Sequence, residues 1–106
     1  MLKNFKTYQL AIEFHKSCLE IKEIPSYLKD QLYRASSSVA LNLAEGSAKP
    51  SGRDQVKFFF IAMGSLRESQ AALIFLPENI VLNQLADKLG AHIYKLIGSA
   101  KRRRRW

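Results

Sequence analysis

Four segments of the chain repeat apolar residues at steps of three and four, and this periodicity constrains the fold more than any other feature. Such spacing places the apolar side chains along one face of a helix. No stretch between turn signals alternates with period two over the length of a strand. The sequence therefore predicts an all-α protein, an up-down-up-down four-helix bundle with short connections, in which residues 1–100 form the bundle and residues 101–106 a basic C-terminal tail.

The first predicted helix spans residues 3–21 and the second spans residues 26–45. Pro25 and Ser26 separate them, since proline disfavours helix in the preceding residue and serine caps a first turn. We expect Gly46 to end the second helix as a left-handed cap. The predicted core faces are Phe5, Tyr8, Ile12, His15 and Leu19 on the first helix, with Leu10, Phe14 and Ile21 as a second strip, and Leu28, Leu32, Ala35, Val39 and Leu43 on the second helix.

The third predicted helix spans residues 53–75, and a fourth follows Leu76-Pro77 and ends at residues 98–101. The third helix is apolar around nearly its whole circumference, so it must be buried on nearly all sides. Each helix of a lone bundle exposes one side to water, so the surplus face implies a partner subunit or a partner protein. The expected core face is Val56, Phe59, Phe60, Met63, Leu66, Leu73 and Ile74, the surplus face is Phe58, Ile61, Ala62, Ala72 and Leu76, and the stripe of the fourth helix is Leu82, Leu85, Leu89, Ile93, Leu96 and Ala100.

Positive charge is concentrated at the C-terminal end of the chain. The formal net charge is +8, and five of the positive charges lie in residues 101–105, which leaves +3 for residues 1–100. A cationic run attracts polyanions such as RNA or DNA, although a merely solvated tail is the simpler alternative. Trp106 beside the run is placed to stack on a base. The predicted nucleic-acid contacts are Lys49, Arg53 and Lys57 around the second loop and Lys101, Arg102, Arg103, Arg104 and Arg105 in the tail.

Residues that support catalysis form no recognisable constellation in this sequence. Glu-x-x-His pairs, which hold metal ions in helical bundles, are absent. His15 and His92 lie on or beside apolar stripes and Cys18 lies within a helix, which favours buried roles for all three. The segment from Gly46 to Gly52 lacks the preceding strand and the Gly-Lys-Ser/Thr ending of a phosphate-binding loop. We expect a protein that is not an enzyme and that uses no metal ion or cofactor.

The sequence also favours a soluble, cytoplasmic protein. Its longest apolar run, Phe58 to Met63, is far shorter than the roughly 20 residues that a membrane span needs. The lone cysteine forms no intramolecular disulfide, and no leader of the secretory type opens the sequence, so a reducing compartment is expected and no membrane partner.

Polar residues run beside the core stripe of the second predicted helix and recur midway along the third. Buried charge is costly unless it is paired, so these groups should meet one another. We hypothesise a structural polar network between the two helices, within a protomer or across a subunit contact, that fixes register and performs no chemistry. The alternative is a partly exposed surface row. The residues of the predicted network are Arg34, Asn42, Glu45, Arg67 and Glu68.

The element from Asn42 to Gly46, followed by the phenylalanine-rich segment 58–62 and by Gly64-Ser65-Leu66-x-Glu68, resembles the four-helix-bundle proteins encoded in rRNA intervening sequences. The resemblance covers about residues 5–97. The same family looks to include the accessory protein of diversity-generating retroelements, a homopentamer with a basic surface that works with a reverse transcriptase. The resemblance implies a homopentameric ring, contact with RNA or DNA and a reverse transcriptase as a candidate partner. The matching positions look architectural, with Gly64 permitting close helix approach: Arg34, Asn42, Glu45, Gly46, Gly64, Ser65 and Glu68.

Two functional hypotheses follow. The leading one is a non-enzymatic, homo-oligomeric protein that binds RNA or DNA independently of sequence, with the symmetry of a ring adding avidity. The alternative is a structural adaptor that grips a protein such as a reverse transcriptase without binding nucleic acid directly, with the charge serving solubility. Deletion of residues 101–106 distinguishes them, because only the first hypothesis places nucleic-acid contacts in the tail.

Overall fold

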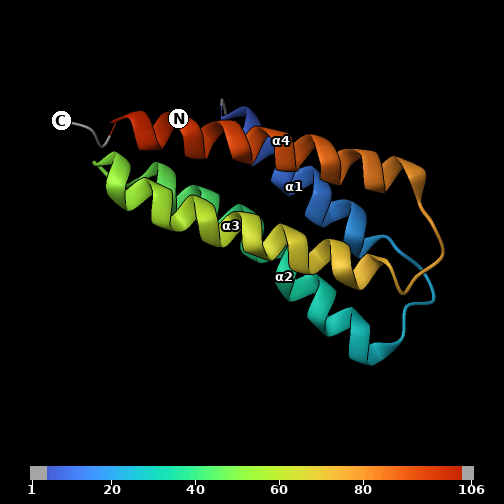
Figure 1. Ribbon diagram of the computed structural model, residues 1–106. Coiled ribbons are helices and arrows are strands. Elements are labelled where there is room, and N and C mark those ends of the chain that lie inside the picture. The colour runs from blue at the N-terminus through green and yellow to red at the C-terminus, as the bar shows by residue number, and fades with distance from the viewer. Residues whose placement is uncertain (1–4, 104–106) are drawn as a thin grey trace.

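The computed structural model describes residues 5–103 and is built almost entirely of helix (Figure 1). The described residues contain no β-strand, and none of their helices is long and apolar enough to cross a bilayer. The direction of the chain alternates from each helix to the next, as the colour gradient of Figure 1 shows. The prediction of an all-α protein with four helices is confirmed. The helices are α1 (Lys6–Leu19), α2 (Ser26–Ser47), α3 (Gly52–Leu73) and α4 (Ile80–Arg103).

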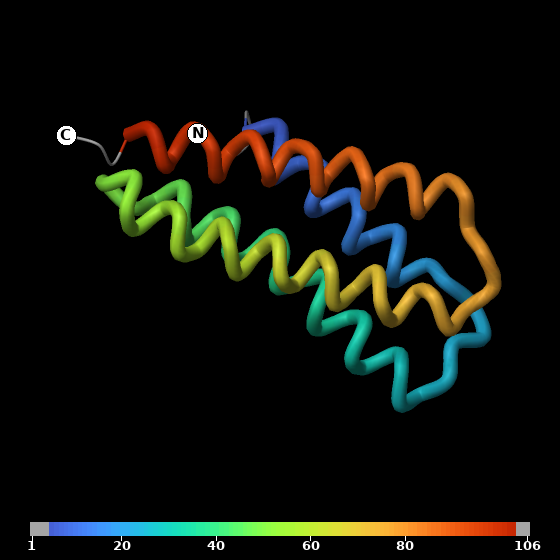
Figure 2. The backbone as a smooth tube through the Cα atoms, in the orientation of Figure 1, coloured from blue at the N-terminus to red at the C-terminus, as the bar shows by residue number. Residues whose placement is uncertain are grey.

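Each helix packs against two others, so the four helices enclose a single core. Helix α2 packs against α1 and α3, and α4 packs against α3 and α1. The molecule is a rod with extents of 49 × 22 × 21 Å. The α1–α2 and α3–α4 connections lie at one end of the rod, and the α2–α3 connection and the last turns of α4 lie at the other (Figure 2). Residues far apart in the sequence are therefore collected at two opposite ends.

The buried face of α1 is rotated about the helix axis from the face predicted for it. The predicted face is only partly buried, and Leu19 is exposed. The second strip holds the core instead, because small side chains such as Ala11 allow close packing beside the large ones. A periodicity that counts only large apolar residues misses this contribution. The buried residues of α1 are Thr7, Leu10, Ala11, Phe14 and Cys18.

The predicted stripes of α2 and α4 fall in the core. All five apolar residues of the α2 stripe are buried. In α4, Leu85 and Leu96 are half-buried, and the other four members of the predicted stripe are buried. Both stripes were predicted correctly because each of these helices has one apolar face and one polar face.

The apolar residues of α3 divide differently from the prediction. Ala62 and Ala72, which were assigned to the surplus face, are buried, whereas Phe60 and Ile74 from the predicted core face are exposed. Ile61 is exposed as predicted for the surplus face. Helix α3 and its C-terminal cap therefore expose apolar side chains that the core does not use. Two of these, Phe60 and Ile74, were predicted to belong to the core face and not to the surplus face.

Gly46 does not end α2 as a left-handed cap, so that prediction was wrong. The helix continues to Ser47, and no glycine in the described residues has a positive φ. A Cβ built on Gly46 would lie 2.7 Å from Cε1 of Phe59 and 3.1 Å from Cβ of Phe58. Glycine is therefore required here for the close approach of α2 and α3. A Cβ on Gly64 meets nothing within 4 Å, so the close approach predicted for Gly64 does not occur within the protomer.

Side-chain caps fix where α3 and α4 begin. The Oγ of Ser51 accepts a hydrogen bond from the backbone N–H of Asp54 at 3.2 Å, and Asp54 lies in the first turn of α3. The Oδ1 of Asn79 accepts from the N–H of Leu82 at 3.0 Å at the start of α4. Such caps satisfy N–H groups that a helix leaves without partners at its N-terminus.

Candidate nucleic-acid interface

The cationic residues predicted to contact nucleic acid gather at one end of the rod. The antiparallel packing of α3 and α4 brings the α2–α3 connection beside the last turns of α4 (Figure 2). We name this region the basic end. Arg104, Arg105 and Trp106, which were also predicted to bind, lie outside the described residues. The basic end consists of Lys49, Arg53, Lys57, Lys101, Arg102 and Arg103.

Two side-chain contacts join the end of α4 to α3 at the basic end. The ammonium of Lys101 lies 5.3 Å from the centroid of the Phe60 ring, within the range of a cation–π interaction. The guanidinium of Arg103 donates a hydrogen bond to Oε1 of Gln55. Residues 101–103 of the predicted tail therefore belong to the last turn of α4, where the helix dipole favours cations.

The remaining lysines of the basic end are arranged around a half-buried aromatic ring. Lys49 and Lys57 place their ammonium groups 5.1 Å and 6.0 Å from the centroid of Phe58. Lys49 also forms an ion pair with Glu45 at 3.1 Å, between partly exposed side chains. Such contacts restrict the lysines to one side of the α2–α3 connection without removing their charge from water.

Carboxylates at this end are outnumbered and already engaged. Glu45 pairs with Lys49, and an oxygen of Asp54 accepts a hydrogen bond from the Ser51 hydroxyl at 3.2 Å. Of the six cationic residues, Lys49 is half-buried and the other five are exposed. The balance of charge at this end is strongly positive, and clusters of this kind attract phosphate groups.

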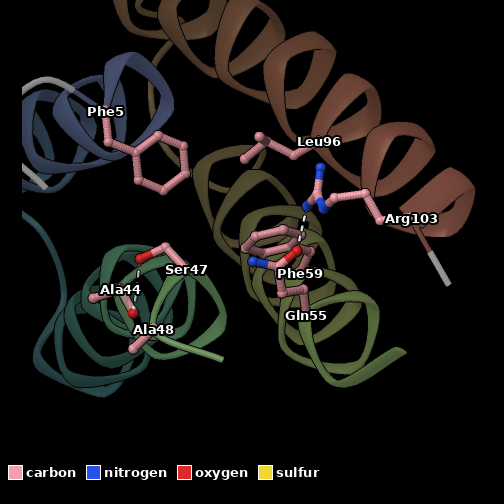
Figure 3. A pocket seen from close by; sticks show the side chains of 8 residues that line it. All are labelled: Phe5, Ala44, Ser47, Ala48, Gln55, Phe59, Leu96 and Arg103. Atoms are coloured by element: carbon pink, nitrogen blue, oxygen red, sulfur yellow. Dashed lines mark hydrogen bonds between the residues drawn. The ribbon is translucent and has the colours of Figure 1, made fainter. Parts of the chain in front are cut away.

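A pocket of about 450 Å3 opens at the basic end between all four helices (Figure 3). Apolar side chains supply most of its wall. The amide of Gln55 and the guanidinium of Arg103 lie together on one side, and the ring of Phe5 lies on the other (Figure 3). No sequence motif pointed to this pocket. Its lining residues are Phe5, Ala44, Ser47, Ala48, Gln55, Phe59, Leu96 and Arg103.

The charged network predicted between α2 and α3 does not form within the protomer. Arg34, Glu45 and Arg67 take partners within their own helices or next to them instead. Arg34 pairs with Asp30 one turn away at 3.4 Å, and Arg67 donates to Oε1 of Gln70 at 2.7 Å. The charged groups remain at the surface because burying them would cost more in desolvation than pairing returns. The hypothesis was therefore wrong for a single protomer, and pairing across a subunit contact stays a prediction.

Uncharged groups make the polar contact between α2 and α3. The hydroxyls of Ser38 and Ser65 lie 2.8 Å apart, and Nδ2 of Asn42 donates to Oγ of Ser38 at 3.0 Å and to its backbone oxygen at 2.9 Å. Asn42 therefore bonds within α2, to the serine that contacts α3, and not to a charged residue of α3 as the predicted network required. The spacing of Ser38 and Asn42 by four residues was the signal available in the sequence.

The side chains with nucleophilic or acid–base character form a second polar cluster within the core. Nδ1 of His15 lies 2.7 Å from Oγ of Ser36, and Ser36 also donates to the backbone oxygen of Tyr33 at 3.3 Å. Burial raises the pKa of Cys18 to about 12, and burial lowers the pKa of His15. Because Ser36 and Cys18 are completely buried, neither is accessible to a substrate. The buried role predicted for Cys18 is confirmed.

His92 lies apart from this cluster, in α4, and is half-buried. Burial lowers its pKa, with smaller contributions from the positive charges of Lys95, Lys88 and Lys6. Within residues 5–103, no three His, Cys, Asp or Glu side chains lie close enough together to hold a metal ion. The basic end and its pocket are therefore the strongest candidates for a functional site.

Comparison with known families agrees with this architecture. A family model described as 23S rRNA-intervening sequence protein matches residues 3–104. The match covers nearly the whole chain and includes every described residue of the basic end. Neither the curated proteins nor the solved structures contain a match to the chain. The resemblance found in the sequence is confirmed, and the chain belongs to the 23S rRNA-intervening sequence protein family.

Proposed function

We propose that this protein binds RNA or DNA through its basic end, as a non-enzymatic and homo-oligomeric accessory protein. The observation that carries the proposal is the gathering of six cationic side chains from the α2–α3 connection, α3 and α4 at one end of the rod. The two carboxylates there, Glu45 and Asp54, already have partners. Contacts of cationic side chains with phosphates read no base, so the binding is largely independent of sequence and weakens as salt rises.

The arrangement of the cations suits a phosphate backbone. Arg53 and Lys57 lie one turn apart on α3, so they present their charges on the same face of the helix. Lys101 packs on Phe60 of the same helix, which aligns the end of α4 with this face. A strand of nucleic acid that follows α3 would meet charges from both helices.

Self-association is supported by the apolar side chains that the protomer leaves in water. Tyr27 and Leu41 of α2 and Phe60 and Ile61 of α3 are among the exposed large hydrophobic residues. Exposed apolar patches of this kind mark contacts between proteins. The homopentameric ring comes from the family resemblance, and in such a ring several basic ends would engage one strand and raise avidity.

The adaptor hypothesis is favoured by a separate observation at the opposite end of the rod. Ile74 and Phe75 follow α3, and Ile80 and Val81 begin α4; all four are more than 60% exposed. A protein partner such as a reverse transcriptase would cover these side chains. This second function requires no contact with nucleic acid.

Binding of fluorescent RNA and DNA strands over a range of salt concentrations tests the first proposal. We expect tight binding at low salt, and an affinity for B-DNA that falls with a logarithmic slope of about −0.9 for each neutralised phosphate. A variant that lacks residues 101–106 should bind more weakly and with a shallower slope, since it loses charge at the basic end. Light scattering should report an oligomer.

Three results would contradict parts of this proposal. Absence of salt-sensitive binding at low ionic strength would refute the nucleic-acid role. A monomer at micromolar concentration would refute self-association. Co-purification of a partner protein by the truncated variant, without any nucleic acid bound by either form, would favour the adaptor hypothesis.

A further inference from the structure

We infer that the pocket at the basic end accepts an unstacked base, so that the protein binds single strands and loops more tightly than duplexes. The inference rests on the proposed function and deepens it, because it names the class of nucleic acid that the basic end recognises. It is carried by the combination of an apolar pocket with a surrounding group of cations.

The wall of the pocket has the chemistry that a base requires. The ring of Phe5 and the side chain of Leu96 supply apolar surface beside the buried ring of Phe59 (Figure 3). The polar part of the wall is the amide of Gln55, whose oxygen accepts from Arg103 and whose Nε2 donates to the backbone oxygen of Lys49 at 3.4 Å. A base has two apolar faces and a polar edge, so it is complementary to such a wall. Stacking of bases on aromatic side chains is the usual device by which proteins bind single strands without reading sequence.

Space is available in the pocket because small residues line one side of it. Ala44, Ser47 and Ala48 occupy the last turn of α2 and its cap, where larger side chains would fill the opening. The volume of about 450 Å3 falls within the range of roughly 300–1,000 Å3 that is typical of small-molecule sites. A single base therefore fits, whereas a base pair held in a stacked duplex has no route into the pocket.

Charge complementarity selects a nucleotide in a polyanionic strand as the occupant. Arg103 belongs both to the pocket wall and to the basic end, so a phosphate beside the inserted base would meet its guanidinium. The other cations, from Lys49 to Arg102, extend over the same end of the rod, farther than the single anionic head of a fatty acid would need. They suit the successive phosphates of a strand.

Filling the pocket tests the inference. We choose Ala44→Phe, which places a ring in the pocket, and Ala48→Phe, which fills it from an exposed position where folding is not at risk. Ala91→Phe is the matched control, because Ala91 is an exposed helical alanine that does not line the pocket. The probes are a single-stranded RNA with one 2-aminopurine, the same strand in a duplex, and oleate as a competitor.

For the wild type and Ala91→Phe, we expect tighter binding of the single strand than of the duplex and a change in 2-aminopurine fluorescence when the base leaves its stack. In both pocket variants the change in 2-aminopurine fluorescence should disappear. Their affinity for the single strand should fall about tenfold, which is the order of magnitude expected for the loss of one stacked base. Their affinity for the duplex should stay the same. Oleate should leave the single strand bound.

The possible failures are distinguishable. Equal affinity for both strand forms, with no effect of either pocket variant, would overturn the base pocket and leave the phosphate contacts of the basic end intact. Displacement of the strand by oleate would assign the pocket to an amphiphile and overturn the inference. Failure of the wild type to bind either form would overturn the proposed function and the inference together.

Discussion

The two ends of the rod are built on the same four helices, yet they expose different chemistry. The basic end combines six cationic side chains with two engaged carboxylates. At the opposite end, which we name the apolar end, the two connections (residues 20–25 and 74–79) hold three carboxylates, Glu20, Glu23 and Glu78, and one lysine, Lys22. The apolar end is defined by its exposed side chains Leu19, Ile74, Phe75, Ile80 and Val81.

The difference shows that exposed side chains at the ends of the rod can vary without changing the fold. The core is formed along the length of the helices, and it does not depend on the exposed side chains at either end. Phe75 and Val81 are about three quarters exposed, so they contribute little to the stability of the protomer. Charge at one end and apolar surface at the other are therefore features that contacts with other molecules explain better than folding does.

The largest expected effect comes from reversing charge at the basic end. The variant Arg53→Glu, Lys57→Glu, Arg102→Glu should lose at least about a hundredfold in affinity for RNA at low salt, because three phosphate contacts become repulsive. Fluorescence anisotropy measures the loss. The control is Lys22→Glu, Lys29→Glu, Lys88→Glu, which changes three exposed lysines outside the basic end and gives the same net charge. Equal losses in the two variants would show that total charge, and not its place, determines binding.

A smaller effect is expected from Gly46→Ala, beside the basic end. The added Cβ meets the ring of Phe59, which is buried, and the Cβ of Phe58, which is fixed to the backbone of α3. Such overpacking costs about 1–3 kcal/mol, and better helix propensity offsets up to about 1 kcal/mol. We expect urea denaturation to show a net loss of about 1–2 kcal/mol. An unchanged or higher free energy of unfolding would contradict the close approach of α2 and α3.

Gly64→Ala is the matched control for this substitution. Nothing lies near the added Cβ, so the helix should gain about 0.5–1 kcal/mol in the free energy of unfolding. A loss of oligomer mass in this variant, measured by light scattering, would instead place Gly64 in a contact between subunits.

The polar cluster between the two ends should make stability depend on pH. Burial lowers the pKa of His15, so protonation is less favourable in the folded state than in the unfolded one. The resulting stability is fully present above about pH 6.5 and is lost as the pH falls through the lowered pKa. Between pH 7.5 and pH 5, the free energy of unfolding measured by urea denaturation should decrease less for His15→Gln than for the wild type. The pKa of His92 is also lowered, so His92→Gln is the comparison. If His15→Gln retains the full decrease, the cluster is not its source.

The smallest effect is expected at the apolar end. The double variant Phe75→Ser, Val81→Ser should change the free energy of unfolding of the protomer by no more than about 0.5 kcal/mol per substitution, since both side chains are exposed. Binding of RNA should not change, because these residues lie far from the basic end. A loss of several kcal/mol, or weaker RNA binding, would show that the two ends do not act separately.

Much of this architecture could be predicted from the sequence, because helix periodicity is a local property. The four helices, the stripes of α2 and α4 and the cationic residues that later meet at one end were all identified in this way. The face of α1 was misplaced because the small residues Thr7 and Ala11 contribute to the core without adding to the apolar pattern.

The remaining errors concern contacts between helices, which no local rule contains. Gly46 matched the rule for helix caps, but its neighbour is Phe59 from another helix. Arg34 could have paired with several carboxylates, and the structure selects Asp30, one turn away. The pocket was missed because its wall draws on all four helices. The small residues Ala44, Ser47 and Ala48, spaced by three and four, were the only trace of it in the sequence.

The most direct test of the account is to map where nucleic acid touches the protein. Photo-crosslinking of the wild type to single-stranded RNA, followed by mass spectrometry, locates the contacts on peptides. We predict crosslinks in residues 44–60 and 95–106 and none above background in residues 19–31 and 73–84. Crosslinks that concentrate at the apolar end, or that spread evenly over both ends, would contradict the claim that the basic end is the nucleic-acid interface.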